Sequence, residues 1–438
     1  MSPVIYPTTN FTATEQLCLT HGEGIYVYDS DGNKYIEGLA SLWCTSLGYS
    51  NTEVIDAITT QLNKLPFSHT FGGKTHAPIM ELADKLRAMV PVEDAYFFFG
   101  NSGSDANDSH YKMLRYYFNA IGKPEKRKII TRERGYHGVT VAAGSMTSLP
   151  ANLAHFDAPL EALGVLRAES PHYYTNRKGN ETEAQFVDRI IQALEDQILA
   201  EGPDTIAAMI VEPITGASGV IVPPEGYYEK LQAILRKHGI LVWADEVICG
   251  FGRTGNWFGS QTLGIKPHIM TIAKGLSSGY QPIGGSVVCD EVAEVIGSDE
   301  FNHGYTYSGH PVAAAVAIEN IKLLKSDNII QNVAINTGPY LQQRWQELAE
   351  HPLVGEARCV GFIGALELVK HTNPIAFFDK PGKVGTICRD ICVNNGLVMR
   401  ATDDTMLISP PLIMTHQHID ELIDKAKRCL DLTLKAVF

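Results

Sequence analysis

Short apolar runs alternate with longer helical patterns through the middle of the chain. The β-rich apolar runs lie at residues 95–99, 206–213, 240–247, 269–275 and 284–289. The segments at 105–118 and 227–239 instead repeat apolar positions at helical spacing. Strands that alternate with helices in this way predict a doubly wound, mainly parallel α/β sheet.

The segments before and after this region have different patterns. Residues 24–38 alternate apolar and polar positions around Asp31-Gly32, which predicts a β-hairpin. Residues 311–325 predict a helix with one apolar face, and the last part of the chain mixes helices with short strands, such as one at 362–369.

The chain of 438 residues exceeds the length that one hydrophobic core usually serves, so two domains are expected. We predict a large α/β domain at 56–324. A smaller α+β domain would be formed by residues 1–55 and 325–438, from both ends of the chain.

The residues at which the apolar runs end carry the candidate chemistry. In an open parallel sheet, ligands bind at the carboxyl ends of the strands. Three runs end at Glu212, Asp245 and Lys274, and the run at 95–99 is followed by the glycine-containing turn 100–104. The sequence therefore predicts two acids, an amine and a turn at one edge of the sheet.

Lys274 competes with a serine for the role of nucleophile. The tract 275–279 matches the G-x-S-x-G pattern of serine hydrolases, with Ser277 as the nucleophile. Such a serine needs a sharp turn directly into a helix, whereas Pro282 and the glycines after it prevent a helix of useful length. We therefore favour Lys274 as a covalent amine and interpret Ser277 as a loop hydroxyl.

Lys274 and Asp245 together indicate one cofactor. A lysine after a strand usually reaches solvent, but Asp245 has apolar neighbours, where an ion is costly unless a cation pairs with it. Pyridoxal phosphate requires a lysine that forms a Schiff base and an aspartate that pairs with the protonated ring nitrogen. Its phosphate could bind at Ser102, Gly103 and Ser104, before a predicted helix, although helix capping explains the serines equally well.

Composition narrows the set of partners. The formal net charge of -13, without a dense Lys/Arg cluster, argues against nucleic acid and against a membrane surface as partners. The first residues lack a signal pattern and no apolar run approaches about 20 residues, so a cytoplasmic protein is expected. The eight cysteines are scattered, and we interpret them as reduced thiols without a metal site.

Several tracts of the sequence resemble those of the class III aminotransferases. They are NSGSDAND, GYHG, VEPITG, WADEVICGFGRTG, AKGLSSGYQPIGG and FNHGYTYSGHP. The resemblance extends over nearly the whole chain, and LASLWC and VMRA make it most similar to the ω-amino acid and amine:pyruvate transaminases. It implies a pyridoxal-phosphate-dependent transferase of fold type I that forms a homodimer, or a dimer of dimers, with shared active sites.

The resemblance also implies roles for the residues around the cofactor ring. Lys274 would form the internal aldimine and later shuttle the proton, and Asp245 would bind the ring nitrogen. Tyr136 would stack on the ring and Val247 would pack against its opposite face, while a surface turn and a core position are the respective alternatives. Glu212 would lie beside the ring substituents or help to order them.

For the phosphate, the resemblance implies Ser102, Gly103 and Ser104, together with Thr306 of a neighbouring subunit, which would make a dimer obligatory. The sequence alone places Thr306 only in a loop before a helix. The chain departs from the family at Thr215, where many members have glutamine, and this casts doubt on the usual cofactor contact of that position.

Three further residues are candidates for substrate binding. By resemblance, Trp43 and Phe71 line an apolar pocket, from one or both subunits, while a core position is the alternative for each. Arg400 would be a mobile arginine that grips a substrate carboxylate and swings out to admit an apolar group. An exposed surface arginine is its alternative.

We therefore expect a cytoplasmic, homodimeric transaminase that moves an amino group from an amine or ω-amino acid to pyruvate by a ping-pong mechanism. Its partners would be a small amine or amino acid donor and a keto acid acceptor. A 2-oxoglutarate-dependent aminotransferase or an aminomutase of the same family is the alternative. A serine hydrolase that uses Ser277 is the rival from another enzyme class.

Overall fold

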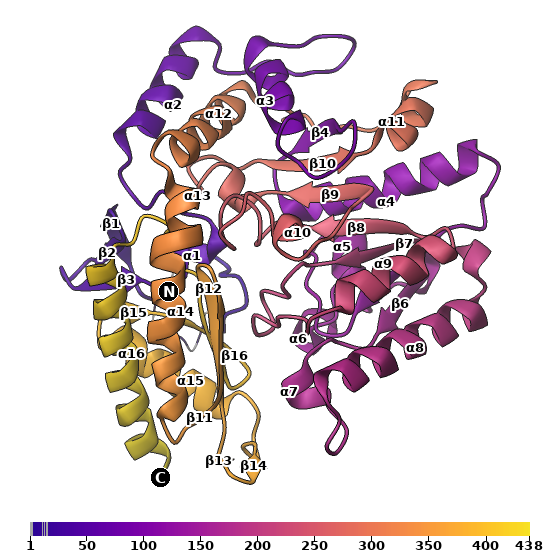
Figure 1. Cartoon of the computed structure of the whole chain (residues 1–438). Coiled ribbons are helices and arrows are strands. Elements are labelled where there is room, and N and C mark those ends of the chain that lie inside the picture. The colour runs from indigo at the N-terminus through magenta and orange to yellow at the C-terminus, as the bar shows by residue number, and fades with distance from the viewer. Residues whose placement is uncertain (1–2, 11, 13, 15) are drawn as a thin grey trace.

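A seven-stranded sheet forms the centre of the larger region in the computed structural model, which describes residues 3–10, 12, 14 and 16–438 (Figure 1). In spatial order, its strands are β4 (Tyr96–Gly100), β10 (Gly284–Val288), β9 (Ile269–Ile272), β8 (Leu241–Asp245), β7 (Ile206–Val211), β5 (Lys128–Arg132) and β6 (Val165–Ala168). The neighbours from β9 to β6 pair in parallel, and β10 is antiparallel to both β4 and β9. The predicted mainly parallel sheet is confirmed.

Helices cover both faces of this sheet, which explains why its strands read as continuous apolar runs. All residues of β7 are buried, and they divide between two hydrophobic clusters. One cluster contains residues of α8 (Glu183–Glu201) and α9 (Tyr227–Lys237), and the other contains residues of α4 (Gly103–Ala120).

Shorter helices connect the strands of the large sheet, and other helices pack against the two four-stranded sheets. The remaining α-helices are α1 (Ala40–Trp43), α2 (Thr52–Lys64), α3 (Ala77–Arg87), α5 (Val141–Met146), α6 (Pro150–Leu153), α7 (Tyr173–Asn176), α10 (Gly259–Thr262), α11 (Asp290–Gly297), α12 (Pro311–Ser326), α13 (Ile329–Asn332), α14 (Gly338–Gln346), α15 (Lys383–Asn394) and α16 (His416–Val437). Among the described residues, no helix is long and apolar enough to cross a bilayer.

The smaller region combines early and late segments of the chain. Its first sheet has the order β1 (Leu19–Glu23), β2 (Tyr26–Asp29), β3 (Lys34–Glu37) and β15 (Leu397–Val398), and its second has the order β11 (Val354–Val360), β12 (Ile363–Leu368), β17 (Thr405–Ile408) and β16 (Arg400–Thr402). A small hairpin pairs β13 (His371–Thr372) with β14 (Ile375–Ala376). The predicted hairpin is β2–β3, and β15 adds to β3 in parallel.

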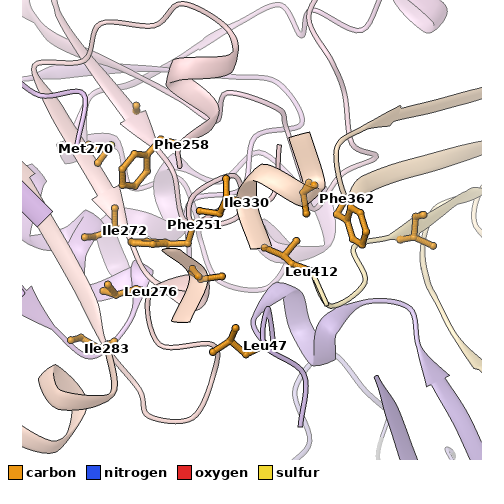
Figure 2. Packing of buried hydrophobic residues seen from close by; sticks show 14 of the residues in the cluster. Leu47, Phe251, Phe258, Met270, Ile272, Leu276, Ile283, Ile330, Phe362 and Leu412 are labelled. Carbon is orange, nitrogen blue, oxygen red and sulfur yellow. The ribbon is translucent and has the colours of Figure 1, made fainter. Parts of the chain in front are cut away.

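Both regions share one continuous hydrophobic core. Figure 2 shows Leu47 from an early segment and Leu412 from a late one near Phe251 of the large region, and all three belong to one cluster of buried residues. The predicted domain limits at 55/56 and 324/325 fall inside α2 and α12, which pack against each other. The division between the domains therefore stays a prediction.

Candidate active site

A cavity of about 350 Å³ lies at the carboxyl ends of β7, β8 and β9, beside the N-terminus of α4. The residues predicted for the cofactor that line it are Ser102, Gly103, Ser104, Tyr136, Glu212, Asp245, Val247 and Lys274. The ends of separate strands thus meet at one edge of the sheet, as the parallel arrangement requires.

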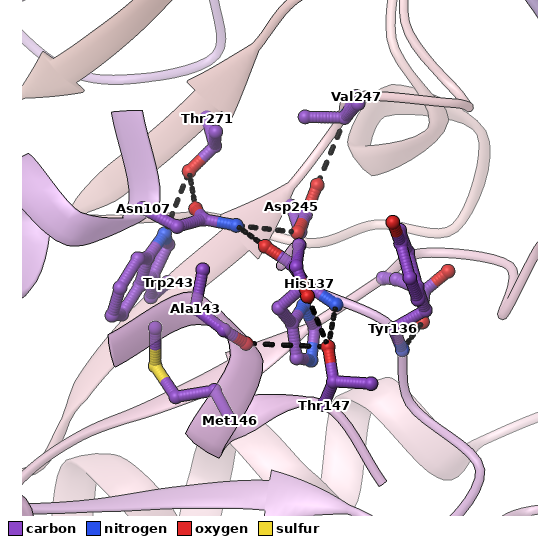
Figure 3. Close-up of polar contacts among 12 residues, drawn as sticks. Asn107, Tyr136, His137, Ala143, Met146, Thr147, Trp243, Asp245, Val247 and Thr271 are labelled. Carbon is purple, nitrogen blue, oxygen red and sulfur yellow. Dashed lines mark hydrogen bonds and ion pairs between the residues drawn. The ribbon is translucent and has the colours of Figure 1, made fainter. Parts of the chain in front are cut away.

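Asp245 presents a buried carboxylate to this cavity. Its Oδ2 accepts hydrogen bonds from Nδ1 of His137 (2.9 Å) and Nδ2 of Asn107 (3.1 Å), and its Oδ1 accepts from the N–H of Val247 (3.2 Å) (Figure 3). The residue is only 3% exposed, so these donors supply the hydrogen bonds that a buried carboxylate needs. The contact with a carboxylate places the proton of His137 on Nδ1.

Lys274 follows β9 and has a left-handed backbone, with φ +46°, which is uncommon for a residue with a side chain. Burial lowers the pKa of its amine and nearby Arg400 adds to this effect, whereas Cys44, Asp245 and Glu212 oppose it. A lowered pKa increases the fraction of neutral amine at a given pH. The neutral amine is the form that can attack a carbonyl carbon.

The N-terminus of α4 provides a site for an anion. Ser102 Oγ accepts a hydrogen bond from the N–H of Asp105 (3.1 Å), and the Asp105 carboxylate accepts one from the N–H of Ser102 (3.0 Å). The capping alternative is therefore correct for the Ser102 side chain. The N–H groups of Gly103 and Ser104 belong to the first helical turn, where no intrahelical acceptor exists, so they can bind a phosphate. A Cβ on Gly103 would lie 2.8 Å from Val247 Cγ2, so the close packing requires glycine.

Glu212 holds the chain segments beside the cavity in place. Its Oε1 accepts a hydrogen bond from the N–H of Tyr136 (2.9 Å) and its Oε2 accepts one from the N–H of Gly216 (2.8 Å). Burial raises the pKa of the Glu212 carboxyl, and these two N–H donors oppose the rise. The acid therefore orders the loop that carries Tyr136, whose ring also lines the cavity.

Thr215, which stands where many family members have glutamine, is directed into the protein. Its Oγ1 accepts a hydrogen bond from Nη2 of Arg132 (3.0 Å), and the same guanidinium donates to the carbonyl of Glu212. Thr215 is buried and is not part of the cavity lining. Through Arg132, its hydroxyl therefore helps to hold the backbone at Glu212 in place.

The structure does not bring Trp43 into the cavity. Trp43 is 2% exposed and belongs to a hydrophobic cluster, as its core alternative expects, whereas its neighbours Leu42 and Cys44 line the cavity. Ala40, Ser41 and Trp43 all have left-handed backbone conformations, which no helical or strand periodicity predicts. A substrate contact by Trp43 stays a prediction.

Phe71 and Thr306 also lie away from the cavity lining, close to one another. Phe71 is 47% exposed, and a Cβ on Gly304 would lie 2.6 Å from its ring, two residues before Thr306. Thr306 is exposed as well. The structure thus places both on the surface of the chain, and their roles in a shared active site stay predictions.

Arg400 lies in β16, paired with Leu407, and is partly buried. Burial lowers the pKa of its guanidinium, and Tyr136 opposes this effect. Arg400 in turn influences the pKa values of both Tyr136 and Lys274, so its charge lies close to the cavity although it does not line it. The alternative of a fully exposed surface arginine does not hold.

Ser277 has no nucleophile elbow around it. Its Oγ donates a hydrogen bond to the carbonyl of Gln281 (2.6 Å), and its side chain is buried. In the described segment 274–288, a single 3₁₀ turn ends at Leu276 and β10 begins at Gly284, so the helix that an elbow requires does not form.

A polar network behind Asp245 was not predicted from the sequence. It contains His137, Asn107, Thr271 and Trp243, all of them buried (Figure 3). Asn107 follows Gly103 by about one helical turn, so a search for polar residues on the sheet-facing side of the helix could have found it.

Comparisons with known proteins agree with this geometry. The family model described as "Aminotransferase class-III" matches residues 9–430. The chain is 49% identical over 420 residues to a putrescine–pyruvate aminotransferase of Pseudomonas aeruginosa, covering 96% of this chain and 91% of that protein. It is 45% identical to a mitochondrial γ-aminobutyrate transaminase 1 of Solanum lycopersicum, covering 97% and 83%.

A solved structure shows the same likeness. An ω-transaminase from Pseudomonas jessenii, in complex with PMP, matches with a TM-score of 0.97 and 46% identity, over 99% of this chain and 97% of that one. The predicted family, fold type I and cofactor are confirmed. The chain belongs to the class III aminotransferases, enzymes that use pyridoxal 5'-phosphate.

Proposed function

We propose that this enzyme moves an amino group from an amine or an ω-amino acid to pyruvate. The observation that carries this proposal is that Lys274 and Asp245 share one cavity with the apolar side chains of Leu42, Ile214 and Ile248. An apolar wall beside a reactive amine suits the alkyl part of an amine donor. The names of the P. aeruginosa and S. lycopersicum relatives support a diamine or ω-amino acid as donor and, in the first case, pyruvate as acceptor.

The residues present fit pyridoxal phosphate. The N–H groups of Gly103 and Ser104 would hold its phosphate, Asp245 its ring nitrogen, and Lys274 would lie at its aldehyde. When bound, the cofactor supplies an electron sink for the negative charge that develops at the substrate carbon.

Lys274 would act as the acid and base of the reaction. Burial lowers the pKa of its Nζ, which in the neutral form would accept the proton of the substrate carbon and would return it to the carbon that receives the amino group. Asp245 Oδ1 would hold the protonated ring nitrogen, while its Oδ2 stays bound to His137 and Asn107.

Arg400 would allow one cavity to accept two unlike substrates. Its guanidinium would bind the carboxylate of pyruvate and would move aside for the alkyl group of an amine. A fixed, buried arginine would cost several kcal/mol once an apolar group faced its unpaired charge. The partial burial of Arg400 near Tyr136 supports this role.

We further propose a homodimer in which Phe71 and Thr306 complete the active site of the partner subunit. Their exposure and mutual proximity, away from the cavity of their own chain, support this arrangement. The cytoplasmic location expected from the sequence stays a prediction.

A donor and acceptor panel tests the proposed reaction. Putrescine, 4-aminobutyrate and 1-phenylethylamine would each be incubated with the holoenzyme and either pyruvate or 2-oxoglutarate, and alanine and glutamate would be quantified. We expect alanine from pyruvate, and no product with Lys274→Ala. Glutamate alone would favour the 2-oxoglutarate alternative, and isomerisation of an amino acid without net transfer to a keto acid would favour the aminomutase.

A further inference from the structure

We propose that Asn107, oriented by Thr271 and Trp243, is the positioning residue that fixes the Asp245 carboxylate for the cofactor ring. The inference rests on the cofactor site described above and extends it to a chain of buried residues that do not line the cavity. Figure 3 shows these side chains in sequence, from the indole to the carboxylate.

The direction of the hydrogen bonds in this chain is fixed at its far end. The indole Nε1 of Trp243 can only donate, so Thr271 Oγ1 accepts from it (2.9 Å). The hydroxyl of Thr271 then donates its single proton to Asn107 Oδ1 (2.6 Å). The carboxamide oxygen of Asn107 therefore faces the Thr271 hydroxyl, and the two acceptors on the other side of the amide require its nitrogen there.

With its oxygen fixed, Asn107 must turn its amide nitrogen toward the cavity side. Nδ2 donates to Asp245 Oδ2 (3.1 Å) and to the carbonyl of His137 (2.6 Å), which uses both of its protons. Oδ2 thus accepts from Asn107 and His137 together, whereas Oδ1 has the N–H of Val247 as its donor among the described residues. Oδ1 is the oxygen that keeps a lone pair for a donor in the cavity.

A second acceptor competes for the Thr271 proton. Nδ1 of His110 lies 3.1 Å from Thr271 Oγ1, and its Nε2 lies 3.2 Å from the carbonyl of Val287. Burial lowers the pKa of His110 to about 4, so its ring is neutral at pH 7. The carbonyl of Val287 can only accept, so Nε2 carries the single proton and Nδ1 is an acceptor. The Thr271 hydroxyl lies closer to Asn107 Oδ1 (2.6 Å) than to His110 Nδ1 (3.1 Å). The shorter distance favours donation of its proton to the Asn107 carboxamide.

The placement of Asn107 connects two parts of the cofactor site. Gly103 and Ser104 begin α4, and Asn107 lies about one turn further on. One helix would therefore hold the phosphate with its N-terminus and set the ring acid with a side chain. A shift of this helix would move both contacts together.

Thr271→Val tests the inference, because it removes only the hydroxyl of a fully buried residue that does not reach the cavity. We expect the dissociation constant of pyridoxal phosphate and kcat each to worsen about tenfold, from the loss of an oriented hydrogen bond to a charged group. KM values should stay within about twofold, since substrate contacts are untouched. The pH dependence of the absorbance of the bound cofactor should shift, and Thr271→Ser should restore all of these properties.

Thr433→Val is the matched control. Thr433 is also fully buried, and its hydroxyl donates to the carbonyl of Cys429 (2.7 Å) in α16, away from the cavity lining. This variant should lose stability but keep the cofactor affinity and spectrum. Trp243→Phe, which removes the indole N–H, is the second variant and should weaken cofactor binding in the same direction if Thr271→Val fails to fold.

The outcomes separate this inference from the proposed reaction. Wild-type cofactor affinity and an unchanged absorbance profile in Thr271→Val, or equal changes in Thr433→Val, would overturn the role of Asn107. An enzyme that binds pyridoxal phosphate and transfers no amino group from the tested amines to pyruvate would refute the proposed function only. The shifts in affinity and absorbance would then still support the inference.

Discussion

The two walls of the active-site cavity are constructed differently. The wall that contains Asp245 is formed by strand ends and α4, and its carboxylate is held by side chains that are themselves hydrogen-bonded. The wall that contains Leu42 is different: Leu42 is 51% exposed and follows two residues with positive φ, and the partly buried Arg400 lies near the cavity without lining it. A fixed wall suits a cofactor present throughout the reaction, whereas an adjustable wall suits two substrates of unlike chemistry.

The largest effect is expected on the fixed wall, from Asp245→Asn. The amide keeps the shape of the side chain but not its charge, so turnover should fall about 10²- to 10³-fold through lost electrostatic stabilisation. The fold and much of the cofactor binding should remain. Steady-state kinetics with circular dichroism and cofactor absorbance check this, and near-normal turnover would show that the acid is only structural.

Arg400, which lies near the cavity, should affect one half of the reaction when it is replaced in Arg400→Ala. The step in which pyruvate accepts the amino group should slow about 10- to 100-fold, because a charge-assisted hydrogen bond to its carboxylate is lost. The step with an apolar amine should change little. Stopped-flow spectroscopy measures the two halves separately, and equal losses in both would mean that Arg400 supports the site generally.

Leu42 and Trp43 provide a comparison of adjacent positions. Trp43→Ala should cost about 3–5 kcal/mol of stability, because removal of the large buried side chain leaves a cavity in a packed hydrophobic cluster. Leu42→Ala should change stability by no more than about 0.5 kcal/mol, since the side chain is half exposed, and should raise KM for an apolar amine several-fold. Denaturant unfolding and KM values test both, and a raised KM without lost stability in Trp43→Ala would place Trp43 in the pocket.

The smallest effect on activity is expected from Ser277→Ala. Its hydroxyl donates to the carbonyl of Gln281 within the loop, so the loss should be about 1 kcal/mol of stability with most transaminase activity retained. Thermal unfolding and steady-state rates measure these quantities. If turnover disappeared while the cofactor stayed bound, the serine would regain a catalytic role.

The wall that contains Asp245 could be predicted from the sequence, because ligands bind where parallel strands end. Glu212, Asp245 and Lys274 each end an apolar run, and the parallel order of β7, β8 and β9 brings them together. The neighbouring strands β5 and β6, with five and four residues, were missed. They are no shorter than β8 and β9, but charged residues interrupt their apolar runs, which leaves only two consecutive large apolar residues in each.

The adjustable wall could not be predicted in the same way. Whether Trp43 or Leu42 faces the cavity depends on left-handed conformations at Ala40, Ser41 and Trp43, which override any regular side-chain alternation. In the proposed homodimer, the positions of Phe71 and Thr306 relative to an active site depend on a second chain. The orientation of Asn107 follows from hydrogen bonds between elements distant in the sequence, from α4 to β9.

The identity of the cofactor lysine tests the account most directly. Borohydride reduction of the enzyme in the presence of pyridoxal phosphate, followed by peptide mapping with mass spectrometry, locates the lysine that carries the cofactor. The account predicts a stable pyridoxyl label on Lys274, at the end of β9 and beside Asp245, and no comparable label in Lys274→Ala. A stoichiometric label on any other lysine, with Lys274 unmodified, would contradict it.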